Sequence, residues 1–428
     1  MNLSPEIILL CMVAAYILAK IFKISTELSM FFAALVGAVA GGAGIPARHI
    51  AEGAFTYLDI ILIFITATFF MNLLKESGGV AFVIRGILKK FHRSKILLFL
   101  LLTLILLIPG ALTGAGSVTV LITGGMIAVV FEYMGLSRPR TAAIVFIIAG
   151  LSAAAPPVSL WAMLTAAGVN MPYVGFFWQL LIPCVVLALL TMFLLGWKGK
   201  RVDLDMALKE LPEAPIKMNW FRVFFPFAAF FLLVIAGRVW PHSLPIIGLP
   251  LMFTVSALMS ILLSPIRLGV FRIAKDTIHQ LLPLIGTLTC VGILVQIMTL
   301  TGVRGLIAIT IVTLPVFIVI ATLALTLPVS EAVLMWGAAP VLGVPLVLLF
   351  NTIGLNPIIA LAGMSVIWPL GDALPPTAII GRLTKDTVRM TEPYGQMLKH
   401  CLVPAALIVV VGTLMVIFSK KLAFLTTL

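Results

Sequence analysis

Apolar runs long enough for membrane helices recur along almost the whole chain and are separated by short polar or basic clusters. Since about 20 apolar residues span a bilayer as a helix, this pattern predicts an all-α polytopic membrane protein. The expected helices are Leu9–Leu18, Met30–Val39, Leu58–Leu74 and Phe176–Leu195 in the first half, and Phe224–Ala236, Ile247–Leu263 and Ile278–Leu300 in the second.

Two interruptions within the apolar runs cannot continue as helix. Thr113–Ser117 is rich in glycine, and Pro156-Pro157 breaks the run that follows. At membrane depth, non-helical backbone is tolerated only where protein buries it or where it lines a polar cavity. Broken helices at matching places in two halves of a chain indicate the binding site of a transporter.

The second half of the chain repeats these landmarks at one constant offset in the numbering. The offset that carries Pro156-Pro157 to Pro375-Pro376 also carries Pro109 to Pro328, Gly124 to Gly343, and Gly135-Leu136 to Gly354-Leu355. We call it the repeat offset, and we call two positions that it relates repeat equivalents. We therefore expect two repeats of one unit, residues 1–200 and 220–428, joined by a linker at 201–219.

The distribution of charge predicts how the repeats are oriented. Only 10% of the residues are charged, against about 25% in a soluble domain. The net charge of +13 comes from basic clusters between apolar runs, a pattern that orients membrane proteins and does not indicate nucleic-acid binding. By the positive-inside rule the loop that holds Lys20 and Lys23 is cytoplasmic, so we expect the N-terminus outside. The linker is then cytoplasmic, and the second repeat is inverted relative to the first.

Each repeat is expected to hold a re-entrant hairpin followed by a broken helix. An amphipathic helix with a basic face precedes the first hairpin, and its basic residues are Arg85, Lys89, Lys90 and Arg93. Both arms of that hairpin have only about 15 apolar residues, fewer than a spanning helix needs. The first hairpin is placed at 95–134 with its tip at Thr113–Ser117, and the first broken helix at 140–168. The second hairpin is placed at 305–352 with its tip near Pro328–Ala332, and the second broken helix at 357–381.

The polar residues near these breaks are the candidates for binding. Helix N-termini attract carboxylates, and unwound carbonyls coordinate cations. The predicted substrate-binding residues are Thr113, Gly114, Gly116, Ser117, Ser159, Ser330 and Thr377. The predicted cation-binding residues are Ser117, Ser152, Pro156, Glu331, Gly371, Asp372 and Pro375. Asp372 and Glu331 are the main candidates, since burying a carboxylate at membrane depth costs free energy and such a residue marks a functional site by default.

Other chemistry is not indicated by the sequence. The four cysteines lie inside apolar runs without a CxxC spacing, so they are expected to be small core residues. No nucleophile–base set and no metal-ligand cluster stands out, so neither an enzyme nor a cofactor is expected. The oxygen-rich breaks suit Na⁺ as a coupling ion, and the two carboxylates leave H⁺ open as an alternative.

The chain resembles the large membrane subunit, or permease, of the tripartite ATP-independent periplasmic (TRAP) transporters in the ion transporter superfamily. The matching motifs are the tip Thr113–Ser117, Pro156-Pro157-Val158-Ser159, Glu331, Pro340 with Pro345, Gly354-Leu355-Asn356-Pro357, and Gly371 to Pro376. Three departures stand out: Val158 interrupts a Pro-Pro-Ser motif, Leu374 replaces a threonine, and Asp372 adds a charge.

The resemblance implies an elevator carrier in a bacterial cytoplasmic membrane. It also implies a Na⁺-coupled organic-acid substrate, such as a C4-dicarboxylate or a sialic acid. A small four-helix membrane subunit and a periplasmic binding protein would be its partners. Three alternatives stay open: a stand-alone Na⁺- or H⁺-coupled carrier or antiporter, a channel on the same plan, and a membrane scaffold that transports nothing.

Overall fold

The computed structural model describes residues 3–173, 176–240 and 247–427, and every regular element in these ranges is a helix. Seven helical stretches are long and apolar enough to cross a membrane. They are Ala47–Glu76, Lys95–Thr113, Phe177–Gly196, Trp220–Gly237, Val270–Leu300, Val316–Gly337 and Tyr394–Ile417. The predicted all-α polytopic fold is confirmed.

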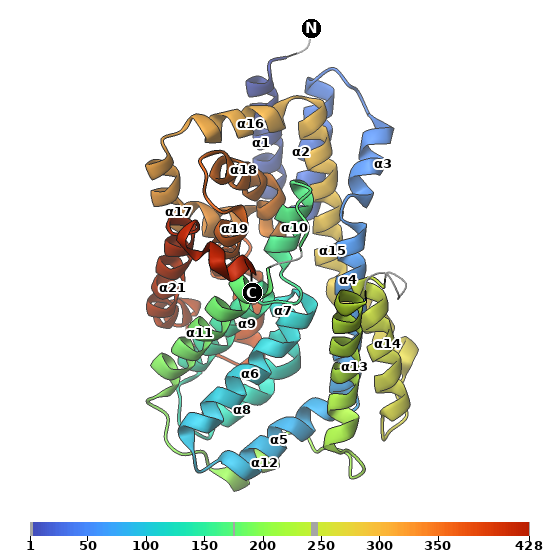
Figure 1. Cartoon of the computed structure of the whole chain (residues 1–428), viewed down its shortest axis with the longest axis vertical. Coiled ribbons are helices and arrows are strands. Elements are labelled where there is room, and N and C mark those ends of the chain that lie inside the picture. The colour runs from blue at the N-terminus through green and yellow to red at the C-terminus, as the bar shows by residue number, and fades with distance from the viewer. Residues whose placement is uncertain (1–2, 174–175, 241–246, 428) are drawn as a thin grey trace.

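The helices form two groups that lie side by side (Figure 1). One group, the scaffold, comprises α1 (Pro5–Ile21), α2 (Thr26–Ala40), α3 (Ala47–Phe55), α4 (Leu58–Glu76), α13 (Trp220–Val239), α14 (Leu249–Leu263) and α15 (Val270–Leu300). Two further helices lie across opposite ends of the molecule, α5 (Gly79–Phe91) at the lower end and α16 (Val303–Thr313) at the upper end of Figure 1. We call these the α5 end and the α16 end.

The other group, the hairpin group, contains both hairpins and both broken helices. The first hairpin is α6 (Lys95–Thr113), α7 (Gly116–Thr119), the π-helical turn η1 (Val120–Gly124) and α8 (Gly125–Glu132). The first broken helix is α9 (Arg138–Ala154) and α10 (Leu160–Gly168), followed by α11 (Phe177–Gly196) and the linker helix α12 (Leu204–Glu210). The second hairpin is α17 (Val316–Leu334), η2 (Met335–Gly337), the π-helical turn η3 (Ala339–Gly343) and α18 (Val344–Thr352). The second broken helix is α19 (Pro357–Ile367), η4 (Trp368–Ala373) and α20 (Ile379–Thr387), followed by α21 (Tyr394–Ile417) and η5 (Lys421–Thr427).

The repeat offset relates the elements of the two halves as well as their prolines. It carries α10 onto α20 and the π-helical turn η1 onto η3, residue for residue. It also carries α9 onto the combined range of α19 and η4. Gly135 and Gly354, which follow the hairpins, both have a positive φ, 73° and 78°. The hairpin and the broken helix therefore recur at equivalent positions in each half.

Local sequence explains where these helices begin. Ser94 precedes α6, and its Oγ accepts a hydrogen bond from the Leu97 N–H. Asn356 precedes α19, and its Oδ1 accepts from the N–H groups of Ile358 and Ile359. Both side chains satisfy backbone donors that a helix start leaves without a partner.

The tip of the second hairpin was predicted wrongly. Pro328–Ala332 is not a turn but lies inside α17, which continues to Leu334. The chain turns at Met335, where φ is 54°. Pro328 misled the prediction because a proline is read as a helix breaker, whereas its repeat equivalent, Pro109, also lies inside a helix. The predicted range 305–352 also includes most of α16, and the hairpin itself begins at Val316.

Candidate functional site

The first break joins α9 to α10 through a short unwound segment that is held against the first hairpin. The N–H of Val158 donates to the Ala111 carbonyl of α6, at 3.0 Å. Ser152 Oγ lies 2.8 Å from Thr119 Oγ1 of the hairpin and also donates to the Ala149 carbonyl. Ser152 and Thr119 are fully buried. We call this packing of the first break on the first hairpin the first contact, and it is made by neutral hydroxyl groups.

The second break is held against the second hairpin in a similar way, but with different chemistry. Thr377, the repeat equivalent of Val158, donates through its side chain to the Ala332 carbonyl of α17, at 2.9 Å. Glu331 and Asp372 lie at this contact and are 0% and 4% exposed. Asp372 follows Gly371, the residue of η4 that packs directly against Glu331 of α17. We call this packing of the second break on the second hairpin the second contact. It contains two acidic side chains, whereas the first contact contains hydroxyl groups.

Neither carboxylate has a cationic partner among the residues that the structure describes. Glu331 Oε2 accepts a hydrogen bond from the Trp161 indole nitrogen at 3.0 Å. Glu331 Oε1 and Asp372 Oδ2 are buried and have no partner within the described ranges. Burying an unpaired charge costs several kcal/mol, so these two oxygen atoms indicate a site for a cation or a proton.

A glycine makes the close approach between break and hairpin possible. A Cβ on Gly371 would lie 2.2 Å from the Pro328 carbonyl oxygen and 2.6 Å from the Glu331 Cβ. Any side chain at 371 would push η4 away from α17 and separate the two carboxylates. In the first half the glycine is on the hairpin instead, since a Cβ on Gly110 would lie 1.9 Å from Ser152 Oγ.

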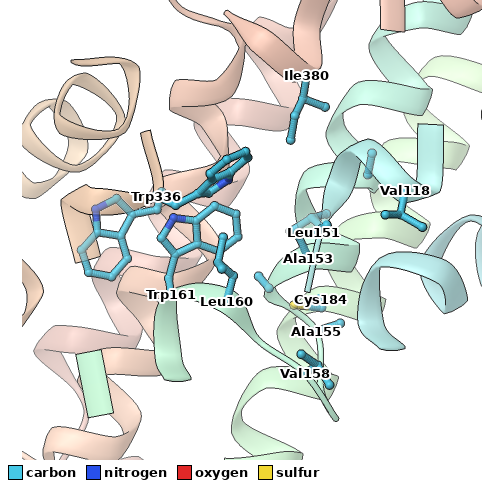
Figure 2. Packing of buried hydrophobic residues seen from close by; sticks show 14 of the residues in the cluster. Val118, Leu151, Ala153, Ala155, Val158, Leu160, Trp161, Cys184, Trp336 and Ile380 are labelled. Atoms are coloured by element: carbon cyan, nitrogen blue, oxygen red, sulfur yellow. The ribbon is translucent and has the colours of Figure 1, made fainter. Parts of the chain in front are cut away.

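The second segment of each broken helix packs on the hairpin of the other repeat. α10 contacts η3, where Thr165 Oγ1 donates to the Ala339 carbonyl, and α20 contacts η1. Figure 2 shows Trp161 of α10 near Trp336 of the second hairpin, while Ala155 and Val158 follow the unwound segment. Both hairpins and both breaks thus belong to one packed unit.

The predicted residues lie at the two contacts, at the first tip, on α17 and in the breaks. Glu331, Gly371, Asp372 and Thr377 come together at the second contact, and Ser152 lies at the first. Thr113, Gly114, Gly116 and Ser117 form the first tip, where Thr113 Oγ1 donates to the Pro109 carbonyl of its own helix. Ser330 Oγ likewise donates to the Leu327 carbonyl of its own helix.

The remaining predicted residues are the break residues Ser159, Pro156 and Pro375. Ser159 Oγ is buried and has no partner among the described residues, while the Ser159 N–H donates to the Tyr173 hydroxyl at 3.0 Å. Both Pro-Pro bonds are cis. Pro156 is buried, whereas Pro375 is exposed. The two breaks therefore differ in how much protein covers them.

Three residues that shape the site were missed by the sequence-based predictions. Trp161 lies in an apolar run, where its single donor does not stand out among hydrophobic neighbours. Thr119 lies just beyond the tip, inside the second arm of the hairpin. Arg304 is basic in a region that the charge rule places outside, and its repeat equivalent is Arg85. The repeat offset could have revealed this pair.

Arg85 and Arg304 both bind carbonyl groups at the end of a helix. Arg304 of α16 donates to the Gly168 carbonyl, which ends α10, at 3.1 Å. Arg85 of α5 donates instead to the Leu208 and Leu211 carbonyls at the end of the linker helix α12, at 2.8 and 3.0 Å. Each arginine thereby ties a surface helix to a neighbouring segment.

A cavity of about 520 Å³ lies at the α5 end, between α4, the second arm of the first hairpin, the linker and the end of α20. Its lining includes Lys75, Glu76, Leu121, Ile122, Met126, Glu210 and Thr387. At the α16 end the equivalent space holds only about 10 Å³. Its lining includes Val295, Pro340, Val341 and Pro345, the repeat equivalents of Glu76, Leu121, Ile122 and Met126. Of these two repeat-equivalent spaces, the one at the α5 end is open and the one at the α16 end is closed.

Solved structures of similar fold include the two that follow. The chain resembles MtrF of Neisseria gonorrhoeae, described as illuminating a class of antimetabolite efflux pumps, with a TM-score of 0.62 and 13% identity over 87% of this chain and 83% of that one. It also resembles the YdaH transporter of Alcanivorax borkumensis, described as having an unusual topology, with a TM-score of 0.62 and 12% identity over 86% of each chain. No protein-family model and no curated protein sequence matches the chain. At these identities the likeness shows a shared overall fold.

Proposed function

We propose that this chain is a secondary active transporter in which a cation at Glu331 and Asp372 drives the movement of a small organic anion. The observation that carries the proposal is the buried pair of carboxylates beside an unwound, proline-broken segment, with no cationic side chain from the described ranges to neutralise them. A bound cation offsets part of the cost of the two buried charges, so the site is more stable when occupied.

Na⁺ is the coupling ion that we place first. It is a hard ion and takes oxygen ligands, and this contact offers Glu331 Oε1 and Asp372 Oδ2, to which no described residue donates. Backbone carbonyls of the break near Gly371 and Pro375 are the further ligands we propose. Protons would also neutralise the carboxylates, one proton for each, and need fewer ligands, so H⁺ is the second candidate.

The organic anion is placed between the first tip and the start of α10. The N-terminus of a helix attracts carboxylates through its free N–H groups and its dipole. Ser159 Oγ, at the N-cap of α10, is buried without a partner in the described part of the chain. A carboxylate there would accept from this hydroxyl, and the tip residues Gly116 and Ser117 would line the other side.

The two unequal cavities support alternating access. In this conformation the space at the α5 end is open and the equivalent space at the α16 end is closed. The basic clusters predict that the α5 end is cytoplasmic, so the conformation faces inward. Because the repeats have equivalent elements, movement of the hairpin group along the scaffold would exchange the two ends. That exchange is the elevator motion, with the N-terminus outside and the chain in a bacterial cytoplasmic membrane.

The two proposed forms of the transporter differ in their partners. As a TRAP permease, the chain would work with a small four-helix subunit and a periplasmic binding protein. As a stand-alone carrier or antiporter, it would need neither. The likeness to MtrF and YdaH, of which one is described as illuminating a class of efflux pumps and the other as a transporter, supports transport by the chain in either form.

The first test is the thermal stability of the purified protein, titrated with NaCl against KCl at fixed ionic strength. A ligand that binds only the folded state raises stability with its concentration. We expect a rise that is specific for Na⁺. Equal curves for the two salts, together with a strong dependence on pH, would replace Na⁺ by H⁺. No dependence on either would contradict the cation site.

Transport itself is tested in proteoliposomes that contain the chain alone. Uptake or efflux of radiolabelled organic acids is measured with a Na⁺ gradient, a proton gradient, or neither. Gradient-driven movement without a binding protein would support the stand-alone form. Movement only after a binding protein and a small subunit are added would support the TRAP form.

A further inference from the structure

Trp161 makes the hydrogen bond that the structure shows between the carboxylate pair and the first repeat. Its indole nitrogen donates to Glu331 Oε2 at 3.0 Å, and the side chain is fully buried. An indole N–H is only a donor, so it cannot itself bind a cation. It holds Oε2 and leaves Oε1, which is buried without a partner among the described residues, as the oxygen available to a cation.

The equivalent position in the second repeat cannot play this role. Ile380 is the repeat equivalent of Trp161, and its side chain has no hydrogen-bonding group. Its terminal methyl group lies against the first hairpin, 3.1 Å from a Cβ placed on Gly116. Of these two equivalent residues, Trp161 can therefore donate a hydrogen bond from its broken helix to a carboxylate, and Ile380 cannot.

α10 connects this contact to the α16 end. Trp161 lies in the first turn of the helix, Thr165 follows one turn later and donates to the Ala339 carbonyl, and Gly168 ends the helix and accepts from Arg304. Residues at these spacings lie along one side of a helix. A helix of 9 residues is short enough to move as one body, and these three attachments are all to the second repeat.

We propose that Trp161 is a positioning residue that couples the occupancy of the cation site to the closure of the α16 end. With a cation bound, Glu331 is fixed and Trp161 holds α10 where Gly168 reaches Arg304. Without a cation, Glu331 loses its fixed orientation, α10 is released at its first turn, and the Arg304 contact weakens. This inference rests on the proposed cation site.

The test compares Trp161→Phe with Trp368→Phe. Both changes remove an indole from a fully buried tryptophan of the same region. Only the first removes a hydrogen bond, since Trp368 Nε1 has no partner among the described residues. A general packing defect would therefore affect both variants alike.

Two readouts are taken on the full chain. The first is the midpoint of Na⁺ in the thermal-stability titration, or of pH if H⁺ is the active ion. The second is the rate at which a maleimide labels the thiol introduced by Val341→Cys after the four native cysteines are replaced. Val341 lines the closed space at the α16 end, so its labelling measures closure.

We expect Trp161→Phe to raise the Na⁺ midpoint roughly tenfold, or to shift the pH midpoint by about one unit, equivalent to about 1.4 kcal/mol. We also expect saturating Na⁺ to slow the labelling of Val341→Cys in the parent and in Trp368→Phe, and not in Trp161→Phe. If Trp161→Phe and Trp368→Phe behave alike, the proposal is overturned although the cation site stands. If the parent protein responds to neither Na⁺ nor pH, both the cation site and this coupling are overturned.

Discussion

The two repeats share one backbone plan and differ in chemistry. In the first, break and hairpin meet through the hydroxyl groups of Ser152 and Thr119. In the second, they meet through the hydrogen bond from Thr377 to the Ala332 carbonyl, beside the buried carboxylates of Glu331 and Asp372. The first contact is stable as it stands, because its groups are neutral and paired. The second holds two acidic groups, and no described residue pairs with two of their oxygens, which is why we propose a cation or a proton there.

The two ends of the molecule also differ in the partners that equivalent residues bind. Arg304 ties the closed α16 end to α10, whereas Arg85 binds the linker and the α5 end is open. Similar elements thus hold different partners in the two repeats. A symmetric fold allows two exchangeable conformations, and its asymmetric residues decide which of them a bound ion favours.

The largest expected effect comes from neutralising the carboxylates. Asp372→Asn and Glu331→Gln should each reduce gradient-driven transport by roughly 100-fold or more, since about 3 kcal/mol of ion binding corresponds to that factor. Both should remove the Na⁺-dependent rise in thermal stability. The fold should persist, because removing a buried charge costs no packing. Uptake in proteoliposomes measures the effect, and Glu6→Gln, an exposed site on α1, is the matched control. Uptake by Asp372→Asn at the parent's rate would eliminate the proposed role.

The glycines offer a second way to separate the two contacts. Gly371→Ala places a Cβ 2.2 Å from the Pro328 carbonyl oxygen, so we expect a loss of about 1–3 kcal/mol of stability and a weaker affinity for Na⁺. Ser152→Ala, at the equivalent position, should cost only about 1 kcal/mol and leave the affinity unchanged. Thermal melts with and without Na⁺ measure both. Equal losses of Na⁺ affinity would mean that the first contact also binds the ion.

Much of the fold follows from the sequence, since apolar runs, glycines and proline pairs determine which segments are helical and where they break. The site is harder to predict. The carboxylates were found because acidic residues are conspicuous in an apolar run. Trp161 was not, because its role depends on a partner 170 positions away in the sequence. The second tip was misplaced because a proline tolerated inside α17 looked like a turn. Contacts between the repeats arise from packing, which local pattern does not encode.

The closed end should respond to Arg304. Arg304→Ala removes the hydrogen bond to Gly168, worth about 1.5–3 kcal/mol for a charged donor, and should shift the population towards the outward-open form. Maleimide labelling of Val341→Cys should then accelerate, while that of its equivalent Ile122→Cys should slow. Arg85→Ala is the matched control, because it frees the linker but not α10. Unchanged labelling at both positions would mean that Arg304 does not hold the closed state.

The smallest effect is expected at the first contact, where Thr119→Val removes one of two paired hydroxyl groups while keeping the shape of the side chain. The loss of one neutral hydrogen bond should lower stability by about 1 kcal/mol, measured by chemical denaturation in detergent. The midpoint of the Na⁺ titration should not change, because the contact is made by neutral groups. A shift of that midpoint would mean that Ser152 and Thr119 coordinate a second ion. The chemical difference between the repeats would then be one of degree, since both contacts would bind cations and the carboxylates would only bind them more tightly.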